Sequence, residues 1–170
     1  MGRRWAVVAA VAILGVAAGC SDDGEGSDVQ RPLVDQIQPA IEAVEAALGG
    51  AQSYFEINAT PQLVNLFVAD GTSDTVVPYV FAGDELQEPG PSSPVSGGTP
   101  FVAEDLTTDF DGVLAGVTAE LENSDISVFV IYADAAGVPR YGATVVSSEG
   151  GVLDVELGPT GEVLAVDPRS

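Results

Sequence analysis

Carboxylates are the most plentiful reactive side chains of this 170-residue chain. It holds 26 Asp and Glu residues against five arginines, with no lysine, no histidine and a single cysteine, Cys20. Without histidine, it lacks the base of a Ser-His-Asp or Cys-His relay and any imidazole metal ligand. Without lysine, it lacks a Walker-type phosphate loop and Schiff-base chemistry. No Gly-x-Ser-x-Gly nucleophile motif is present either, so we expect no enzymatic activity.

The charge balance excludes one class of partner. The formal net charge is −21, and the five basic residues are Arg3, Arg4, Arg31, Arg140 and Arg169. A nucleic-acid-binding protein needs cationic side chains that displace counterions from phosphates. We therefore expect no nucleic acid partner, and the residue types give no reason to expect a cofactor.

Paired carboxylates could act as the acid and base of a glycosidase, which holds them about 5–10 Å apart. Some pair among 26 acidic residues reaches that separation by chance, so a carboxylate-dependent hydrolase is only an alternative. Thr107, Asp109, Asp111 and Gly112 match positions 1, 3, 5 and 6 of a calcium-binding EF-hand loop, but position 12 is Thr118 instead of Glu. We expect these acids to stabilise a helix N-terminus, and we expect no metal site.

The first twenty residues have the order of an export signal. Arg3 and Arg4 precede the apolar run Trp5–Ala18, whose 14 residues are fewer than the roughly 17–25 of a membrane-spanning helix. Val16–Cys20 resembles the lipobox of bacterial lipoproteins, in which small residues precede a cysteine that becomes lipid-modified. The resemblance implies that Cys20 is the mature N-terminus, carries a palmitate-type lipid and anchors the protein to the cell membrane, facing outside the cytoplasm.

This resemblance divides the N-terminal region into a signal peptide, residues 1–19, and a flexible acidic tether, residues 20–30. The lysine-free composition, rich in Ala, Val and Gly, is typical of an actinobacterial protein. Two alternatives stay open. The chain could be an ordinary secreted protein cleaved after Gly19, and export could follow the twin-arginine or the general secretory route.

Two amphipathic helices with the same spacing are predicted in the body. In both, apolar residues fall at i, i+4, i+8, i+11 and i+15, and the second set lies 73 residues after the first. The two stripes are Leu33, Ile37, Ile41, Val44 and Leu48, and Leu106, Phe110, Leu114, Val117 and Leu121.

Period-two alternation between turn residues predicts three strands after each helix, and a short fourth strand near the C-terminus. At the same offset of 73, Phe55 aligns with Val128, and Ile57 aligns with Val130. The predicted strands are residues 54–59, 62–69 and 75–82 in the first half, and 126–132, 140–147, 152–157 and 162–166 in the second.

The predicted fold is α+β, with two tandem helix–strand–strand–strand repeats at residues 31–86 and 101–168. A Pro/Gly/Ser-rich linker, residues 87–100, joins them. The short connections allow only antiparallel neighbours, so we expect an antiparallel sheet or sheets with the helices packed on one face. Pro78 cannot donate to a ladder and indicates an edge. By architecture alone, this arrangement resembles tandem helix-plus-sheet units of secreted inhibitor-like and protease-propeptide-like domains.

We expect a non-enzymatic binding or interaction module of the cell envelope, held at the membrane through the lipid on Cys20. Its partner would be an envelope protein, peptide or polymer, and the composition does not identify which. The first alternative is a carrier of an apolar ligand or lipid between helices and sheet; the second is the hydrolase above. Arg140 is expected to pair with an acidic neighbour on the sheet, with contact to an anionic ligand as its alternative role.

Overall fold

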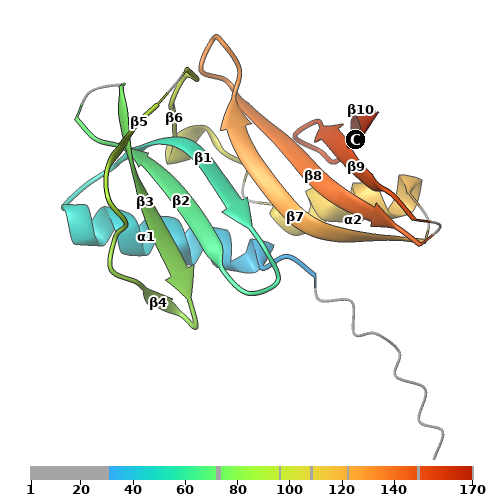
Figure 1. Ribbon diagram of the computed structural model, residues 1–170, viewed down its shortest axis with the longest axis horizontal. Coiled ribbons are helices and arrows are strands. Elements are labelled where there is room, and N and C mark those ends of the chain that lie inside the picture. The colour runs from blue at the N-terminus through green and yellow to red at the C-terminus, as the bar shows by residue number, and fades with distance from the viewer. Residues whose placement is uncertain are drawn as a thin grey trace, which may run out of the picture.

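The chain folds into an α+β body with one ten-stranded antiparallel sheet in this computed structural model (Figure 1). The structure describes residues 31–71, 74–95, 97–107, 109–121, 123–148 and 150–169. The helices are α1 (Ile37–Leu48) and α2 (Phe110–Glu120), with short 3-10 turns at Val34–Gln36 and Ala103–Asp105. The strands are β1 (Ser53–Ala59), β2 (Val64–Ala69), β3 (Thr75–Ala82), β4 (Glu85–Leu86), β5 (Ser93–Pro94), β6 (Phe101–Val102), β7 (Ser124–Ala133), β8 (Pro139–Ser147), β9 (Val152–Leu157) and β10 (Val163–Pro168).

Both halves of the chain contribute to the same sheet. Its strand order is β10-β9-β8-β7-β1-β2-β3-β4, with β5 paired to β3 and β6 paired to β1. The halves meet at the antiparallel β1–β7 ladder, where Ile57 lies opposite Ile131. Neighbouring strands within each half are joined by short connections, as the sequence predicts, and are antiparallel.

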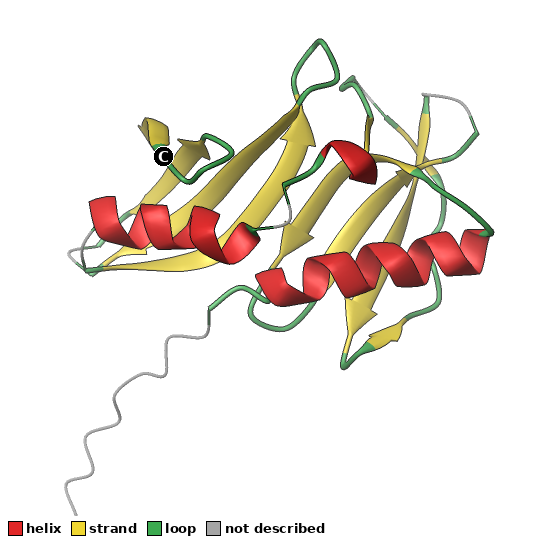
Figure 2. Ribbon diagram, turned by 180° about the vertical axis from the view of Figure 1, so that it is seen from behind, coloured by secondary structure: helices red, strands yellow, loops and turns green. Residues whose placement is uncertain are grey.

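The helices α1 and α2 both lie on one face of the sheet, and no helix of the described residues lies on the other face (Figures 1 and 2). A continuous apolar cluster fills the layer between the helices and the sheet. Tyr54, Phe101 and Phe129 are among its largest fully buried side chains, each at most 2% exposed. The rings of Phe129 and Tyr141 stack with centroids 6.2 Å apart, and the Thr107 N–H donates to the Tyr141 hydroxyl at 2.9 Å, which fixes the segment before α2.

The apolar stripes bury the helix faces that the sequence predicts. Ile37, Ala40, Ile41 and Val44 of α1 are buried, and so are Phe110, Val113, Leu114 and Val117 of α2. Both helices begin one turn later than their stripes, however, because Leu33 and Leu106 lie outside them. A hydrogen bond to the Asp109 carboxylate from the Gly112 N–H caps the start of α2 at 2.9 Å, and Gly49, with φ of 82°, ends α1.

The strand alignment at an offset of 73 is wrong. Ile57 faces the core and is fully buried, whereas Val130 is half-buried and lies opposite Asn58, on the other face. A one-residue slip moves a side chain to the other face of a sheet. The burial patterns of β1 and β7 match instead between residues 72 apart: Tyr54, Ile57 and Ala59 in β1 are buried, as are their counterparts Ile126, Phe129 and Ile131 in β7.

The segment between the halves is not a free linker, although it is as poor in regular structure as its composition predicts. β5 pairs with β3 at Val76, and β6 pairs with β1 at Tyr54. Since β2 lies between β3 and β1, residues 93–95 and 97–102 cross the helix-free face, and we call them the crossing segment (Figure 1). Two-residue ladders such as these depend on tertiary contacts and leave no periodicity in the sequence.

The C-terminal hairpin rests directly on α2 through two glycines. A Cβ added to Gly116 would lie 2.2 Å from the carbonyl oxygen of Gly161. Gly161 itself has φ of 91°, in the left-handed region that side chains disfavour. The β9–β10 turn and the helix therefore approach more closely than any other residue pair would allow at this point.

Candidate functional site

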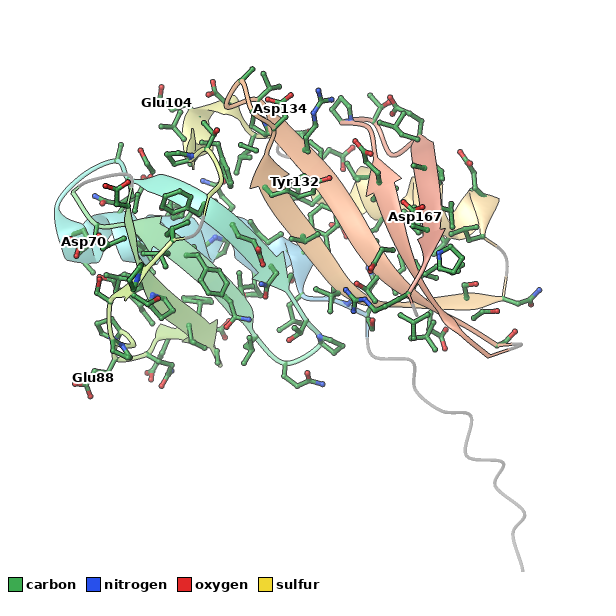
Figure 3. The ribbon with its side chains drawn as sticks, turned by 45° about the horizontal axis from the view of Figure 1, so that its top comes forward. Asp70, Glu88, Glu104, Tyr132, Asp134 and Asp167 are labelled. Atoms are coloured by element: carbon green, nitrogen blue, oxygen red, sulfur yellow. The ribbon has the colours of Figure 1, made fainter. Side chains whose placement is uncertain are left out.

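The helix-free face of the sheet, which we call the open face, carries the side chains that alternate with the core. Across its centre, Glu56 lies opposite Tyr132 in the β1–β7 ladder, and Tyr132 lies opposite Arg140 in the β7–β8 ladder. Figure 3 shows Tyr132 near the middle of this face, Asp134 at the β7–β8 turn and Asp167 at the C-terminal edge. The pairing of β1 with β7 therefore brings together polar residues from both halves of the chain.

A hollow of about 470 Å³ lies on the part of the open face formed by β7, β8 and β9. We call it the acidic hollow, because four carboxylates line it and Arg169 is the one basic residue in its lining. The carboxylates belong to Glu56, Asp154, Glu156 and Asp167, and the remaining lining includes Val130, Tyr132, Gly142 and Thr144.

Gly142 forms the floor of the acidic hollow because it has no side chain. A Cβ at this position would lie 3.1 Å from Val130 Cγ1, 3.2 Å from the Val155 carbonyl oxygen and 3.8 Å from Tyr132 Cε1. The Tyr132 ring therefore lies beside the bare backbone, as diagonal cross-strand aromatic residues do over glycine. A ligand group entering here would meet the ring on one side and carboxylates around it.

A second hollow, of about 520 Å³, lies between the crossing segment and the open face of the first half. We call it the aromatic hollow, because Phe55 and Phe67 line it; its lining also includes Val76, Val95 and Gly98 and the polar Thr99. Glu56 and Tyr132 line both hollows, so the two adjoin across the β1–β7 ladder.

Local interactions hold the shared residues in place. The Asn58 side-chain amide donates to Glu56 Oε1 at 2.8 Å, and the Asn65 amide donates to Asn58 Oδ1 at 2.7 Å. Partial burial raises the pKa of the Tyr132 hydroxyl, the nearby Glu156 charge raises it further, and Arg140 opposes the shift. Tyr132 therefore stays a neutral hydrogen-bonding group at physiological pH.

The expected pairing of Arg140 with an acidic neighbour is confirmed. Its Nη2 and Nε donate to Asp134 Oδ2 at 2.8 and 3.2 Å. Asp134 Oδ1 accepts from the backbone N–H groups of Ala136 at 2.9 Å and Val138 at 3.1 Å. The Arg140 hydrogen bond, followed by these backbone bonds, lowers the pKa of the Asp134 carboxyl. Arg140 is thus engaged in ordering the β7–β8 turn, which leaves the anionic-ligand alternative without support.

Replacing Asp134 by Asn should destabilise the protein in a pH-dependent way. The folded state lowers the pKa of Asp134, so its stabilising effect is full above the unfolded-state pKa and is lost as the pH falls through the folded-state pKa. In urea unfolding, the midpoint difference between wild type and Asp134→Asn should be clear at pH 7 and should shrink as the pH falls toward 2. Glu104→Gln, at an exposed carboxylate, should leave the pH 7 midpoint nearly unchanged. An equal Asp134→Asn difference at both pH values would contradict the prediction.

The EF-hand-like segment forms a helix start. Asp109 caps α2, and Asp111 forms an ion pair with Arg31. Arg31 thereby connects the start of the described chain to the second half. Within the described ranges, no three Asp, Glu, Cys or His residues are grouped as a metal site would require.

The lipidation residue Cys20, the signal peptide and the tether lie outside the described residues. The described part contains no helix long and apolar enough to cross a bilayer. A hollow of about 300 Å³ between α2 and the start of β7 is the one that most resembles a carrier cavity; it opens to solvent and includes the charged Arg31 and Asp111. It gives the carrier alternative no apolar enclosure.

No protein-family model, curated protein or solved structure matches the chain. Its function therefore has to be argued from the open face. Sequence reasoning identified Arg140 but missed Glu56, Tyr132 and Gly142. Their only signal was their place at outward positions of predicted strands, and which strands are neighbours across the two halves is a tertiary property.

Proposed function

We propose that this protein is a lipid-anchored, non-enzymatic binding module of the cell envelope, exposed outside the cytoplasm, and that the open face is its binding surface. The observation that carries the proposal is the contrast between the two faces. Two helices cover one face over an apolar core, whereas the other face carries two adjoining hollows with aromatic and carboxylate side chains. The lipobox resemblance supports the anchor on Cys20 and the location.

The proposal includes two tandem repeats, each a helix followed by an antiparallel group of strands. The β-bulges support it: one lies between Tyr54 and Glu56 in β1, and another lies 72 residues later, between Ile126 and Val128 in β7. The central register supports it too. Ile57 pairs with Ile131 and Ala59 pairs with Phe129, so shifting either pair by 72 residues generates the other. A pseudo-twofold axis would pass through the Asn58–Val130 pair.

Photocrosslinking in intact cells tests the binding surface. Benzoylphenylalanine would be placed at Thr144 and Val80 on the open face, and at the exposed helix positions Ala46 and Ala119 as matched controls. We expect light-dependent adducts mainly from the two open-face positions, because the partner would cover that face. Adducts that form equally from the helix positions, or only from them, would overturn the proposal.

A further inference from the structure

We propose that the open face binds an extended peptide segment that presents an apolar side chain to the aromatic hollow and an arginine or lysine to the acidic hollow. This inference deepens the proposed function and rests on it, since it names the partner chemistry of the same surface. The open face has no partner element of its own in the described structure beyond the crossing segment, and its two hollows differ in character.

Charge complementarity selects a cationic group for the acidic hollow. In the described part of the chain, arginines pair with Asp111, Asp134 and Asp154. The carboxylates of Glu56, Glu156 and Asp167 have no such partner there, so the hollow keeps an excess of negative charge next to the Tyr132 ring. A guanidinium or ammonium group would gain ion pairs and a cation–π contact in this place. An anionic group would be repelled.

The aromatic hollow selects an apolar side chain. Phe55 and Phe67 are half-buried on the open face, and the crossing segment forms the opposite wall, with Gly98 packed at the Phe55 ring. A side chain that entered between them would remove apolar surface from water on both walls.

The two hollows differ because corresponding open-face positions of the two proposed repeats carry different side chains. Asn65 on β2 fills the position that Gly142 leaves bare on β8, as their pairing with Asn58 and Val130 indicates. Pro78 and Val80 on β3 correspond in the same way to Asp154 and Glu156 on β9. At these positions the first half of the open face carries no carboxylate, whereas the second half carries two.

The strand spacing sets the length of the occupant. Phe67 on β2 and Gly142 on β8 are three inter-strand steps apart, or about 14 Å at about 4.8 Å each. They are also offset by two residues, about 7 Å, along the strands, because Phe67 lies in the same cross-strand row as Arg140, so their separation is about 16 Å. An extended chain rises about 3.4 Å per residue and directs residues i and i+4, about 14 Å apart, to the same side, and the length of an arginine side chain covers the remaining distance. A peptide crossing the strands with an apolar residue at i and a basic residue at i+4 would occupy both hollows.

Fluorescence anisotropy with the purified full-length lipoprotein in neutral detergent tests this geometry. The probe is the peptide Phe-Ser-Ser-Ser-Arg, amidated and N-acylated with an uncharged dye. We expect saturable binding that weakens with salt. Changing Arg to Glu or Phe to Ala in the probe should each weaken binding about fivefold or more. Absence of saturable binding, or equal binding of the Glu probe, would overturn the inference.

Matched variants locate the contact. Combined Glu56→Gln and Glu156→Gln should weaken binding of the Arg probe about fivefold to tenfold and flatten its salt dependence. The double control Glu88→Gln and Glu104→Gln removes two exposed charges elsewhere and should leave the affinity unchanged. An equal loss in both double variants would contradict the assigned place.

The two experiments fail separately. Open-face crosslinks in cells without binding of the Arg probe would overturn the cationic-peptide inference and leave the proposed function standing. An open-face crosslink to a second copy of this chain, or to a segment without basic residues, would also overturn the inference. Absence of crosslinks from the open-face positions would overturn the proposed function.

Discussion

Phe129→Ala should lower the unfolding free energy by about 3–5 kcal/mol, the usual range for a large aromatic residue in a core, and Tm by about 10–15 °C. Phe129 is fully buried on β7, the strand that joins the two halves. Its cross-strand neighbours are alanines on both sides, Ala59 on β1 and Ala143 on β8. Neither alanine can fill the space that the ring would leave, so most of the cavity should persist.

The neighbouring residue offers a matched control for this substitution. Val130→Ala changes the same strand one position away, on the open face, where Val130 is half-buried. Its cost should be about 1 kcal/mol or less, because fewer methyl groups leave water on folding. Urea unfolding followed by far-UV circular dichroism measures both variants. Equal costs would mean that the assignment of the two faces of β7 is incorrect.

Cys20→Ala should remove palmitate labelling and release nearly all of the protein from membranes. One acyl chain gives marginal, reversible membrane binding, at about 0.8 kcal/mol per buried methylene, whereas two signals give stable anchoring. The proposed lipid on Cys20 supplies these chains, and nothing else in the proposal does so. Fractionation of cells labelled with a clickable palmitate analogue measures both effects.

Ser21→Ala, next to the proposed anchor, is the matched control and should keep both the label and the membrane association. Wild-type protein without label would indicate the alternative of an ordinary secreted protein cleaved after Gly19. Membrane association that survives Cys20→Ala would refute the lipid anchor.

Two of the strands could be predicted to the residue because their signal is local. The prediction for residues 152–157 coincides with β9, and that for residues 75–82 coincides with β3, since alternating apolar residues between turn residues specify a strand without reference to the rest of the chain. The helices of the two halves align at an offset of 73 residues, whereas β1 and β7 align at an offset of 72. This difference was not predictable from the helix stripes. It arises in the helix-to-strand connections, where hydrophobic periodicity gives no information.

The binding surface was predictable only in part, for a related reason. Arg140 stood out by its charge and Asp134 lies six residues before it, so their pairing is a property of one hairpin. Glu56 and Tyr132 are far apart in the sequence and meet only because β1 pairs with β7. The bare backbone of Gly142 can be recognised as the floor of a hollow only when its neighbours on both sides are known. Sequence patterns give the face of each strand but not the identity of its neighbour across the halves.

The β1–β7 ladder also affects how the protein folds. It joins segments about 70 residues apart, and closing a long loop costs entropy before the new contacts can repay it. Proteins rich in such distant contacts fold slowly. During synthesis, β1 and β2 are complete long before residues 124–133 exist, so β1 would carry an unpaired inner edge for that time. This edge, normally hidden in the middle of the sheet, would be an aggregation-prone surface of the newly made chain.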